Sequence, residues 1–183
     1  MSYAYRIKLD KQSTQVEQTG EWSLSLLELL PPTEMRSLLL EALIDQGWQQ
    51  DAQKIHIVLQ GIRCELDEDE LKVVASLHDE VSVEHTVVAD SDDSSDLRRA
   101  RLEQGKKDQE RALQRASEGK SRELTARLME LEPLILEHIN RASHQVHSAA
   151  LKIKAGRLGK VISTKEESND DGELELTIHV KLT

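Results

Sequence analysis

The chain has 183 residues, of which 38% are hydrophobic and 32% are charged, and its net charge is −10. This length allows one compact domain, or two small ones that share a core. No apolar run approaches the roughly 18 residues of a membrane span, and the N-terminus lacks the apolar region of a signal peptide. The single cysteine, Cys64, excludes an internal disulfide and agrees with a reducing compartment. We therefore expect a cytoplasmic protein without membrane contact.

The charge is distributed unevenly along the chain. Residues 1–90 hold 17 acidic and 7 basic side chains, whereas residues 91–183 hold 17 of each. An acidic half repels phosphate backbones. The basic clusters of the second half are interleaved with acidic residues, which is typical of a solvated helix surface. Nucleic acid is therefore not an expected partner.

The N-terminal part predicts a strand followed by a helix. Apolar and polar side chains alternate over residues 3–9, the pattern of a half-buried strand, and the polar stretch at residues 11–21 is expected to break the structure. After a pair of prolines, Thr33 is the expected N-cap of a helix. Gly47 is expected to end this helix, whose apolar face comprises Met35, Leu38, Leu39, Ala42 and Leu43.

Further strands are predicted before residue 89. Gly61 and the acidic run at residues 65–70 separate alternating segments, which comprise residues 55–59, 62–66, 71–77 and 81–88. This order indicates an α+β fold, with a small N-terminal antiparallel sheet and one or two helices. The sequence ADSDDSSD then predicts a boundary. We expect an N-terminal α+β unit at residues 1–89 and an acidic linker at residues 90–96.

Residues 97–183 predict a long helix or helical hairpin with a coiled-coil-like pattern, followed by a C-terminal β-hairpin. Apolar residues are sparse up to Lys120 and Gly105 weakens the helix, so this part is expected to be solvated or frayed. Pro133 is expected to kink or break the helix. Apolar residues at spacings of three, four or seven form what we call the apolar stripe: Leu124, Leu128, Leu131, Ile135, Ala142, Val146, Ala149 and Ile153.

The C-terminal hairpin is predicted from strands at residues 161–164 and 174–182, joined by a polar turn at residues 168–172. A lone hairpin is marginal in water. We therefore expect it to pack on the long helix or to join the N-terminal sheet, so that both ends of the chain belong to one folded body.

No set of residues completes a catalytic or metal site. Residues 119–121 (Gly-Lys-Ser) echo the end of a phosphate-binding loop but lack its first glycine and its strand. His138, His144 and His147 have no carboxylate or cysteine at a helical spacing that would complete a zinc site. The acidic run at residues 65–70 lacks the spaced ligands of a calcium loop. We therefore expect no enzymatic activity, no metal and no cofactor.

Three segments carry a resemblance to a known family. They are W-x-L-x-L-L-x-L-L-P-P-x-E-M-R-x-L-L-L-x-x-L-x-x-x-G-W at residues 22–48, A-L-K-x-K-A-x-x-L-G-x-V at residues 150–161, and D-G-E-L-E-L-T-I at residues 171–178. Together they resemble small accessory proteins of bacterial ternary systems. Those gene clusters encode a AAA+ ATPase, FtsH-like or MoxR-like, beside a von Willebrand A-domain protein. The resemblance implies a partner-binding component of an ATPase-driven assembly and carries no catalytic residues.

The expected function is that of a non-enzymatic accessory or adaptor protein. The resemblance implies a AAA+ ATPase or a von Willebrand A-domain protein as partner, and the long helical segment is the expected contact, with the apolar stripe as partner-binding surface. One alternative is a self-associating coiled-coil scaffold, in which a second copy covers the stripe. The other is a small-ligand-binding regulatory protein built on the N-terminal unit. Packing of the stripe within the chain and between chains both agree with the pattern.

Overall fold

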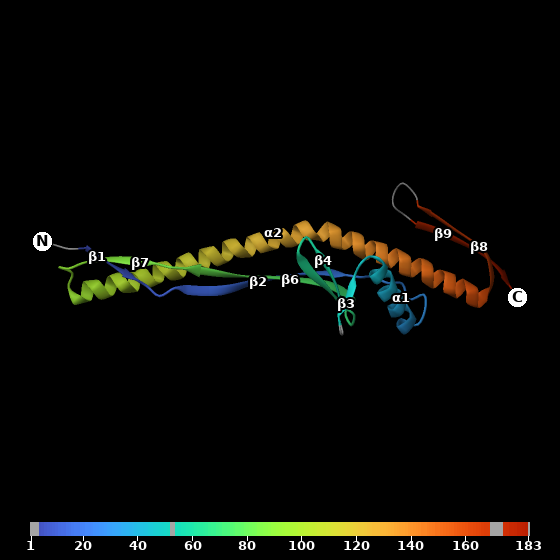
Figure 1. Cartoon of the computed structure of the whole chain (residues 1–183), viewed down its shortest axis with the longest axis horizontal. Coiled ribbons are helices and arrows are strands. Elements are labelled where there is room, and N and C mark those ends of the chain that lie inside the picture. The colour runs from blue at the N-terminus through green and yellow to red at the C-terminus, as the bar shows by residue number, and fades with distance from the viewer. Residues whose placement is uncertain (1–3, 52–53, 169–173, 183) are drawn as a thin grey trace. The chain divides into compact units, whose positions relative to one another are not determined.

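The computed structural model describes residues 4–51, 54–168 and 174–182. It contains an antiparallel sheet in the N-terminal part, a long helix and a C-terminal β-hairpin, which confirms the expected α+β class (Figure 1). The elements are, in order, β1 (Ala4–Lys8), β2 (Gln12–Ser23), α1 (Pro32–Asp45), β3 (Gln49–Asp51), β4 (Lys54–Leu59), β5 (Ile62–Asp67), β6 (Lys72–Val83), β7 (Thr86–Asp90), α2 (Ser95–Leu158), β8 (Gly159–Ser168) and β9 (Leu174–Leu182).

Contacts between residues divide the chain into two compact units. Unit 1 comprises Met1–Thr19 with Ser76–Glu130, and unit 2 comprises Gly20–Ala75 with Leu131–Thr183. Each unit therefore combines segments from before and after the acidic linker that we predict at residues 90–96. That linker is short in the structure, because β7 extends to Asp90 and α2 begins at Ser95.

Unit 1 is held together by the contact of α2 with the β1–β7 ladder and its loops. Gly105 and Gln109 of the helix are buried. The Gln109 amide nitrogen donates to the backbone oxygens of Asp10 at 2.8 Å and Val83 at 3.1 Å. Of the two expectations for the helix before Lys120, fraying was wrong, whereas most of its side chains are exposed or half-buried as a solvated helix requires. Tertiary contacts to a glycine and a glutamine stabilise this segment in place of apolar side chains.

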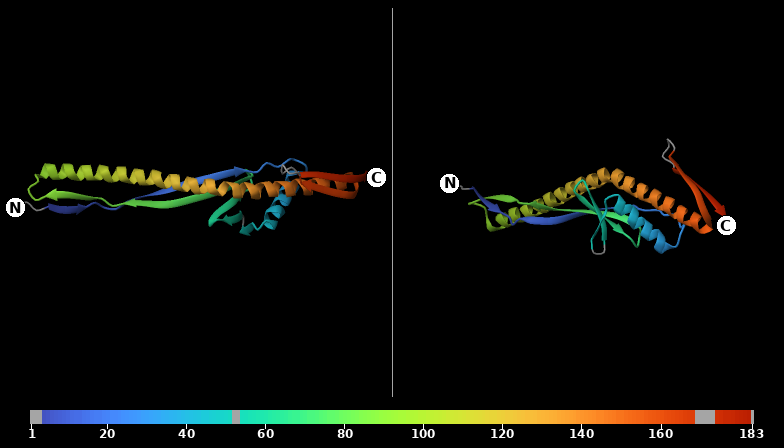
Figure 2. Two further views of the ribbon diagram at one scale, coloured as in Figure 1. Left: turned by 90° about the horizontal axis from the view of Figure 1, so that it is seen from above. Right: turned by 45° about the vertical axis from the view of Figure 1, so that its right-hand side comes forward.

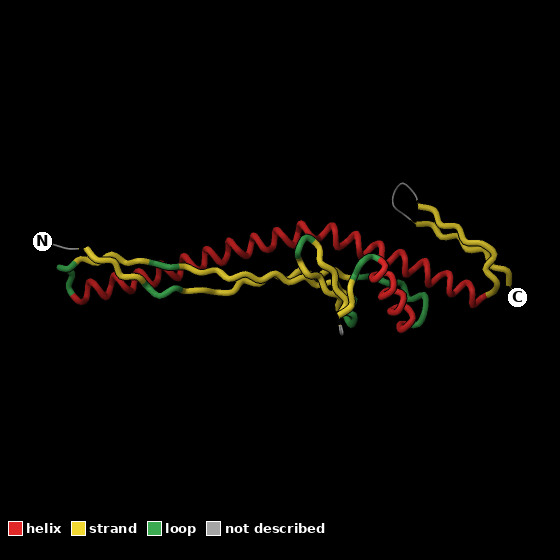
Figure 3. The backbone as a smooth tube through the Cα atoms, viewed as in Figure 1, coloured by secondary structure: helices red, strands yellow, loops and turns green. Residues whose placement is uncertain are grey.

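Unit 2 contains α1, the short strands β3 to β5, the C-terminal part of α2 and the strands β8 and β9. Figure 3 shows the helices of the chain in red and its strands in yellow. Strand β4 pairs antiparallel with β5, and Ile55 lies opposite Leu66. In the described part of this unit the core is formed by Trp22, Leu24, Leu30, Met35, Leu39, Ala42, Leu43, Trp48, Ile55, Ile62, Cys64, Leu66, Val73, Ala75, Leu131, Ile135, Ile139, Ala142, Val146, Ala150 and Ala155.

Two strands differ from the prediction. Strand β2 occupies the polar stretch that we expected to be irregular. It alternates between inward and outward positions, but polar side chains such as Gln18 share the inward positions with Val16 and Trp22, which hides the period of two. Strand β6 is continuous from Lys72 to Val83, where two strands were expected. It adjoins β2 in the five-stranded order β2-β6-β5-β4-β3.

Helix α1 begins and ends at unusual residues. Pro31 is its N-cap and makes no side-chain capping bond, and Pro32 is the first helical residue. The prediction of Thr33 as N-cap was therefore wrong, because the fixed φ of proline suits the first helical position. Gly47 ends the helix as predicted, with a φ of 90°. The next residue, Trp48, donates its backbone N–H to the Leu43 oxygen and is buried.

Helix α2 is continuous across Pro133 and leads directly into the predicted hairpin (Figure 2). Strands β8 and β9 form a separate two-stranded sheet, so the expectation that they could join the N-terminal sheet was wrong. The predicted turn at residues 168–172 lies almost entirely outside the described residues. None of the hairpin side chains whose burial the structure describes is buried. In the described part of the chain, neither helix combines the length and hydropathy that crossing a membrane requires.

Candidate functional site

Two neighbouring cavities lie on the surface of unit 2. One measures about 530 Å³ and has a charged lining. The other measures about 380 Å³ and has a mostly apolar lining. Arg36, Glu68 and Asp69 line both, so the cavities adjoin at these three residues. We call the pair the α1 groove, because both cavities lie beside this helix. Cavities of this size are typical of binding sites.

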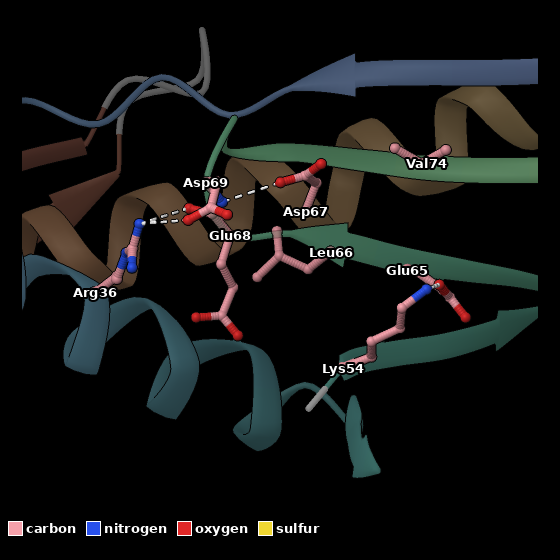
Figure 4. A pocket seen from close by; sticks show the side chains of 8 residues that line it. All are labelled: Arg36, Lys54, Glu65, Leu66, Asp67, Glu68, Asp69 and Val74. Atoms are coloured by element: carbon pink, nitrogen blue, oxygen red, sulfur yellow. Dashed lines mark hydrogen bonds and ion pairs between the residues drawn. The ribbon is translucent and has the colours of Figure 1, made fainter. Parts of the chain in front are cut away.

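The charged cavity lies between α1 and the turn from β5 to β6 (Figure 4). Asp67 shapes this turn, since its Oδ1 accepts from the backbone N–H groups of Asp69 at 3.0 Å and Glu70 at 3.1 Å. Arg36 reaches the turn from α1. Its Nη2 donates to the Glu68 backbone oxygen at 3.1 Å and lies 3.5 Å from Asp69 Oδ1. The turn therefore presents carboxylates to solvent, with one guanidinium holding its backbone.

At the other end of this cavity Lys54 pairs with Glu65 of the sheet, which Arg63 also contacts from outside the cavity lining. Lys54 and Arg63 both donate to Glu65. These hydrogen bonds, the one from Lys54 first, lower the pKa of the Glu65 carboxyl below its ordinary value. Glu65 therefore stays ionised and offsets one of these two positive charges, and Asp51 lies 3.6 Å from the Arg63 guanidinium as a second carboxylate. The remaining carboxylates make the cavity acidic, so it suits a basic group of a partner.

The apolar cavity is bordered by the irregular segment before α1. Its apolar lining comprises Leu26, Leu27, Leu30, Pro32, Met35 and Leu71. Leu27 is 61% exposed. Its backbone N–H donates to His147 Nε2 of α2 at 2.9 Å, which holds this exposed leucine in a defined position. Leu27 is thus a preorganised apolar anchor at the edge of the groove.

The structure places most of the apolar stripe inside the protein. Six of its residues are at most 7% exposed, namely Leu124, Leu128, Leu131, Ile135, Ala142 and Val146. Ala149 is half-buried, and Ile153 is 37% exposed. The stripe therefore packs within the chain over most of its length. Its role as a partner-binding surface stays a prediction, and the exposed Ile153 is the stripe residue most accessible to a partner.

The helical histidines have separate structural partners. His138 lies edge-on to Trp48, with 6.3 Å between ring centroids, and contacts the Gln46 amide at 3.2 Å through Nδ1. His147 accepts from Leu27, while His144 lines a different cavity. Burial is the main cause that lowers the pKa of both His138 and His147. Among the residues that the structure describes, no three metal-ligating side chains converge.

The structure also places the Gly-Lys-Ser segment at residues 119–121 and the single cysteine, Cys64. Residues 119–121 lie within α2, where helical hydrogen bonding engages the backbone amides, and Lys120 pairs with Asp79 at 2.9 Å. Cys64 is fully buried in β5, and burial raises the pKa of its thiol to about 11. At that pKa the reactive thiolate is scarce near neutral pH.

Sequence reasoning missed the α1 groove. The acidic run at residues 65–70 was a signal for one wall, and the leucine-rich segment before the prolines was a signal for the other. Their combination depends on Arg36 meeting Asp69, which is 33 residues away along the chain. No local pattern contains that contact.

Comparison with known families agrees with the resemblance in the sequence. The family described as FtsH ternary system domain X5 matches residues 1–182. The chain belongs to this family. Membership in the X5 family supports the role of a small accessory component of an FtsH-associated ternary system. Comparisons with curated proteins and with solved structures find no match.

Proposed function

We propose that this X5-family protein is a non-enzymatic adaptor that binds an FtsH-like AAA+ ATPase of its ternary system in the cytoplasm. The observation that carries the proposal is the α1 groove, which combines an open apolar cavity with an acidic one in a chain that matches the family over residues 1–182. A partner segment with apolar side chains beside a basic one is complementary to both halves.

Leu27 is the residue on which we expect binding to depend most. It is exposed, apolar and held in place by the hydrogen bond to His147, so a partner gains buried apolar area without ordering this loop. Binding energy at interfaces is concentrated in a few well-packed residues, and we expect Leu27 to be one of them. In this proposal the long helix acts as a frame that positions the groove through His147.

Because most of the apolar stripe is buried, its residues are not free to bind a partner while they remain in the core of this chain. A coiled coil with a second copy through Leu131 or Ile135 would require these side chains to leave their own core. An Asp at either position would bring a charge into that core, so a loss of binding in such a variant would report unfolding. Surface residues of the groove therefore give the sharper test.

The non-enzymatic part of the proposal is supported by the chemistry of the groove. Its cations, Arg36 and Lys54, contact carboxylates of the same cavity. In the described chain, neither cavity of the groove is lined by a serine, cysteine or histidine. ATP hydrolysis by the purified protein above a buffer blank, retained by a preparation free of ATPase, would contradict this part.

The adaptor role can be tested with the ATPase encoded in the same gene cluster. We expect the immobilised chain to bind it, and Leu27→Asp to weaken binding at least about tenfold. Val58→Asp is the matched control, because Val58 is 59% exposed in the same unit but lies outside the groove. The proposal fails if Leu27→Asp, shown to be folded by circular dichroism, binds as tightly as Val58→Asp.

A further inference from the structure

The C-terminal hairpin exposes an unpaired strand edge. Strands β8 and β9 pair only with each other among the described strands, so one edge of β9 has free backbone donors and acceptors. Leu176, Ile178 and Val180 are half-buried on one face of β9, and Val161 of β8 lies opposite Val180. Such an edge is a template for pairing with another strand.

The sequence of β9 is self-complementary about Ile178. In an antiparallel pairing of two β9 strands centred on this residue, Glu175 of one strand lies opposite Lys181 of the other, and this pair occurs twice. Leu176 lies opposite Val180, also twice, and the two copies of Ile178 face each other. Apolar residues thus meet on one face, and opposite charges meet on the other. Both kinds of cross-strand pair are favourable.

The free edge of strand β8 is a poorer template than that of β9. Its register with β9 is shifted between Val161 and Ser163, and such irregularities protect an edge from further pairing. Glu166 of β8 lies 3.5 Å from Lys152 of α2. The outer edge of β9 is therefore the better template.

We propose that β9 pairs antiparallel with β9 of a second copy about a two-fold axis at Ile178, which forms a four-stranded sheet in the order β8-β9-β9-β8. A symmetric interface of this kind closes at the dimer. A two-stranded hairpin is marginal in water, whereas more strands with an apolar face are stable, so dimerisation also stabilises the hairpin. This inference is independent of the proposed ATPase partner.

Charge exchange tests the pairing. Analytical ultracentrifugation of the full chain should show a dimer. E175K and K181E each create two like-charged pairs across the β9–β9 interface, so each should weaken dimerisation at least about tenfold. The double variant E175K/K181E restores opposite charges and should recover the wild-type dissociation constant. An equimolar mixture of the two single variants should form a heterodimer for the same reason.

A cross-link gives a second readout. In antiparallel strands, directly opposite Cα atoms lie about 4.5–5.5 Å apart, so I178C should form an intermolecular disulfide on mild oxidation. Cys64 is buried and serves as the internal control, since wild type should not cross-link. The proposal is overturned if wild type stays monomeric at the concentration at which I178C cross-links. It is also overturned if the single variants dimerise as well as wild type, or if the double variant fails to recover.

Discussion

Gly105 of α2 packs against Val87 of β7. A Cβ at this position would overlap the Cγ2 of Val87, whose branched side chain has little rotational freedom. The glycine that weakens the helix in isolation is therefore the residue that allows the helix and the strand to approach. A glycine in a predicted helix can mark a contact rather than an interruption.

Replacement of Gly105 by Ala should destabilise unit 1. Overpacking lowers the free energy of unfolding by about 1–3 kcal/mol. The higher helix propensity of alanine raises it by about 1 kcal/mol. Gly119→Ala in the same helix is the control, because a Cβ there meets nothing within 4 Å. We expect the control to be more stable than wild type and at least about 1 kcal/mol more stable than Gly105→Ala by urea denaturation. Equal free energies of unfolding would contradict the close contact.

Two histidines should make the stability of unit 2 depend on pH. Burial lowers the pKa of His138 and His147 below the ordinary value of 6.5, so the unfolded chain binds protons more readily than the folded chain. The contribution of these two histidines to the free energy of unfolding is therefore fully present above about pH 6.5 and is lost as the pH falls below that value. His147 must also be neutral at Nε2 to accept from Leu27.

The measurement is the thermal midpoint between pH 7.5 and 5.0. In this window Glu65 and Asp79 stay ionised, because their hydrogen bonds with lysines and other groups lower their pKa from 4.5 and 3.8. We expect the midpoint to fall with pH in wild type and to fall less in the variant His138→Gln/His147→Gln. A midpoint with the same slope in both proteins would exclude these two groups as the cause.

At the scale of elements, α2 has a buried face and an exposed face side by side. Ile135 is fully buried, whereas the next residue, Leu136, is 39% exposed. Ile135→Ala should lower the free energy of unfolding by about 2–5 kcal/mol, because it leaves a cavity. Leu136→Ala should cost less than about 1 kcal/mol. Similar costs for the two variants, measured by denaturant unfolding, would show that the face we describe as buried is solvated.

Strand β2 shows which elements a local pattern does not reveal. Its half-buried Gln18 donates to Ser121 of α2 at 3.0 Å and accepts from Thr125 at 3.3 Å. Polar side chains thus replace apolar ones on the inward face, and a hydropathy pattern reads this face as solvent-exposed. Partners that lie over 100 residues away decide whether the segment is a strand.

At the scale of the whole molecule, the hairpin is the part that we expect to be separable. Its described side chains include no buried ones, and the Lys152–Glu166 pair that joins it to α2 is exposed. Deletion of residues 159–183 should therefore lower the free energy of unfolding of the remaining chain by less than about 1 kcal/mol. The same deletion should abolish dimerisation. A molten or insoluble truncated chain would instead place the hairpin in the common core, as the sequence alone predicted.

The sequence by itself determined the elements whose signal is local. The second half of α2 follows from periodic apolar residues, the hairpin follows from alternation, and the family follows from the three quoted segments. Only the tertiary structure decided that the apolar stripe is mostly buried, that β2 is a strand, and that Arg36 meets the acidic turn. Each of these depends on contacts between residues far apart in the chain, whose free energy no local periodicity contains.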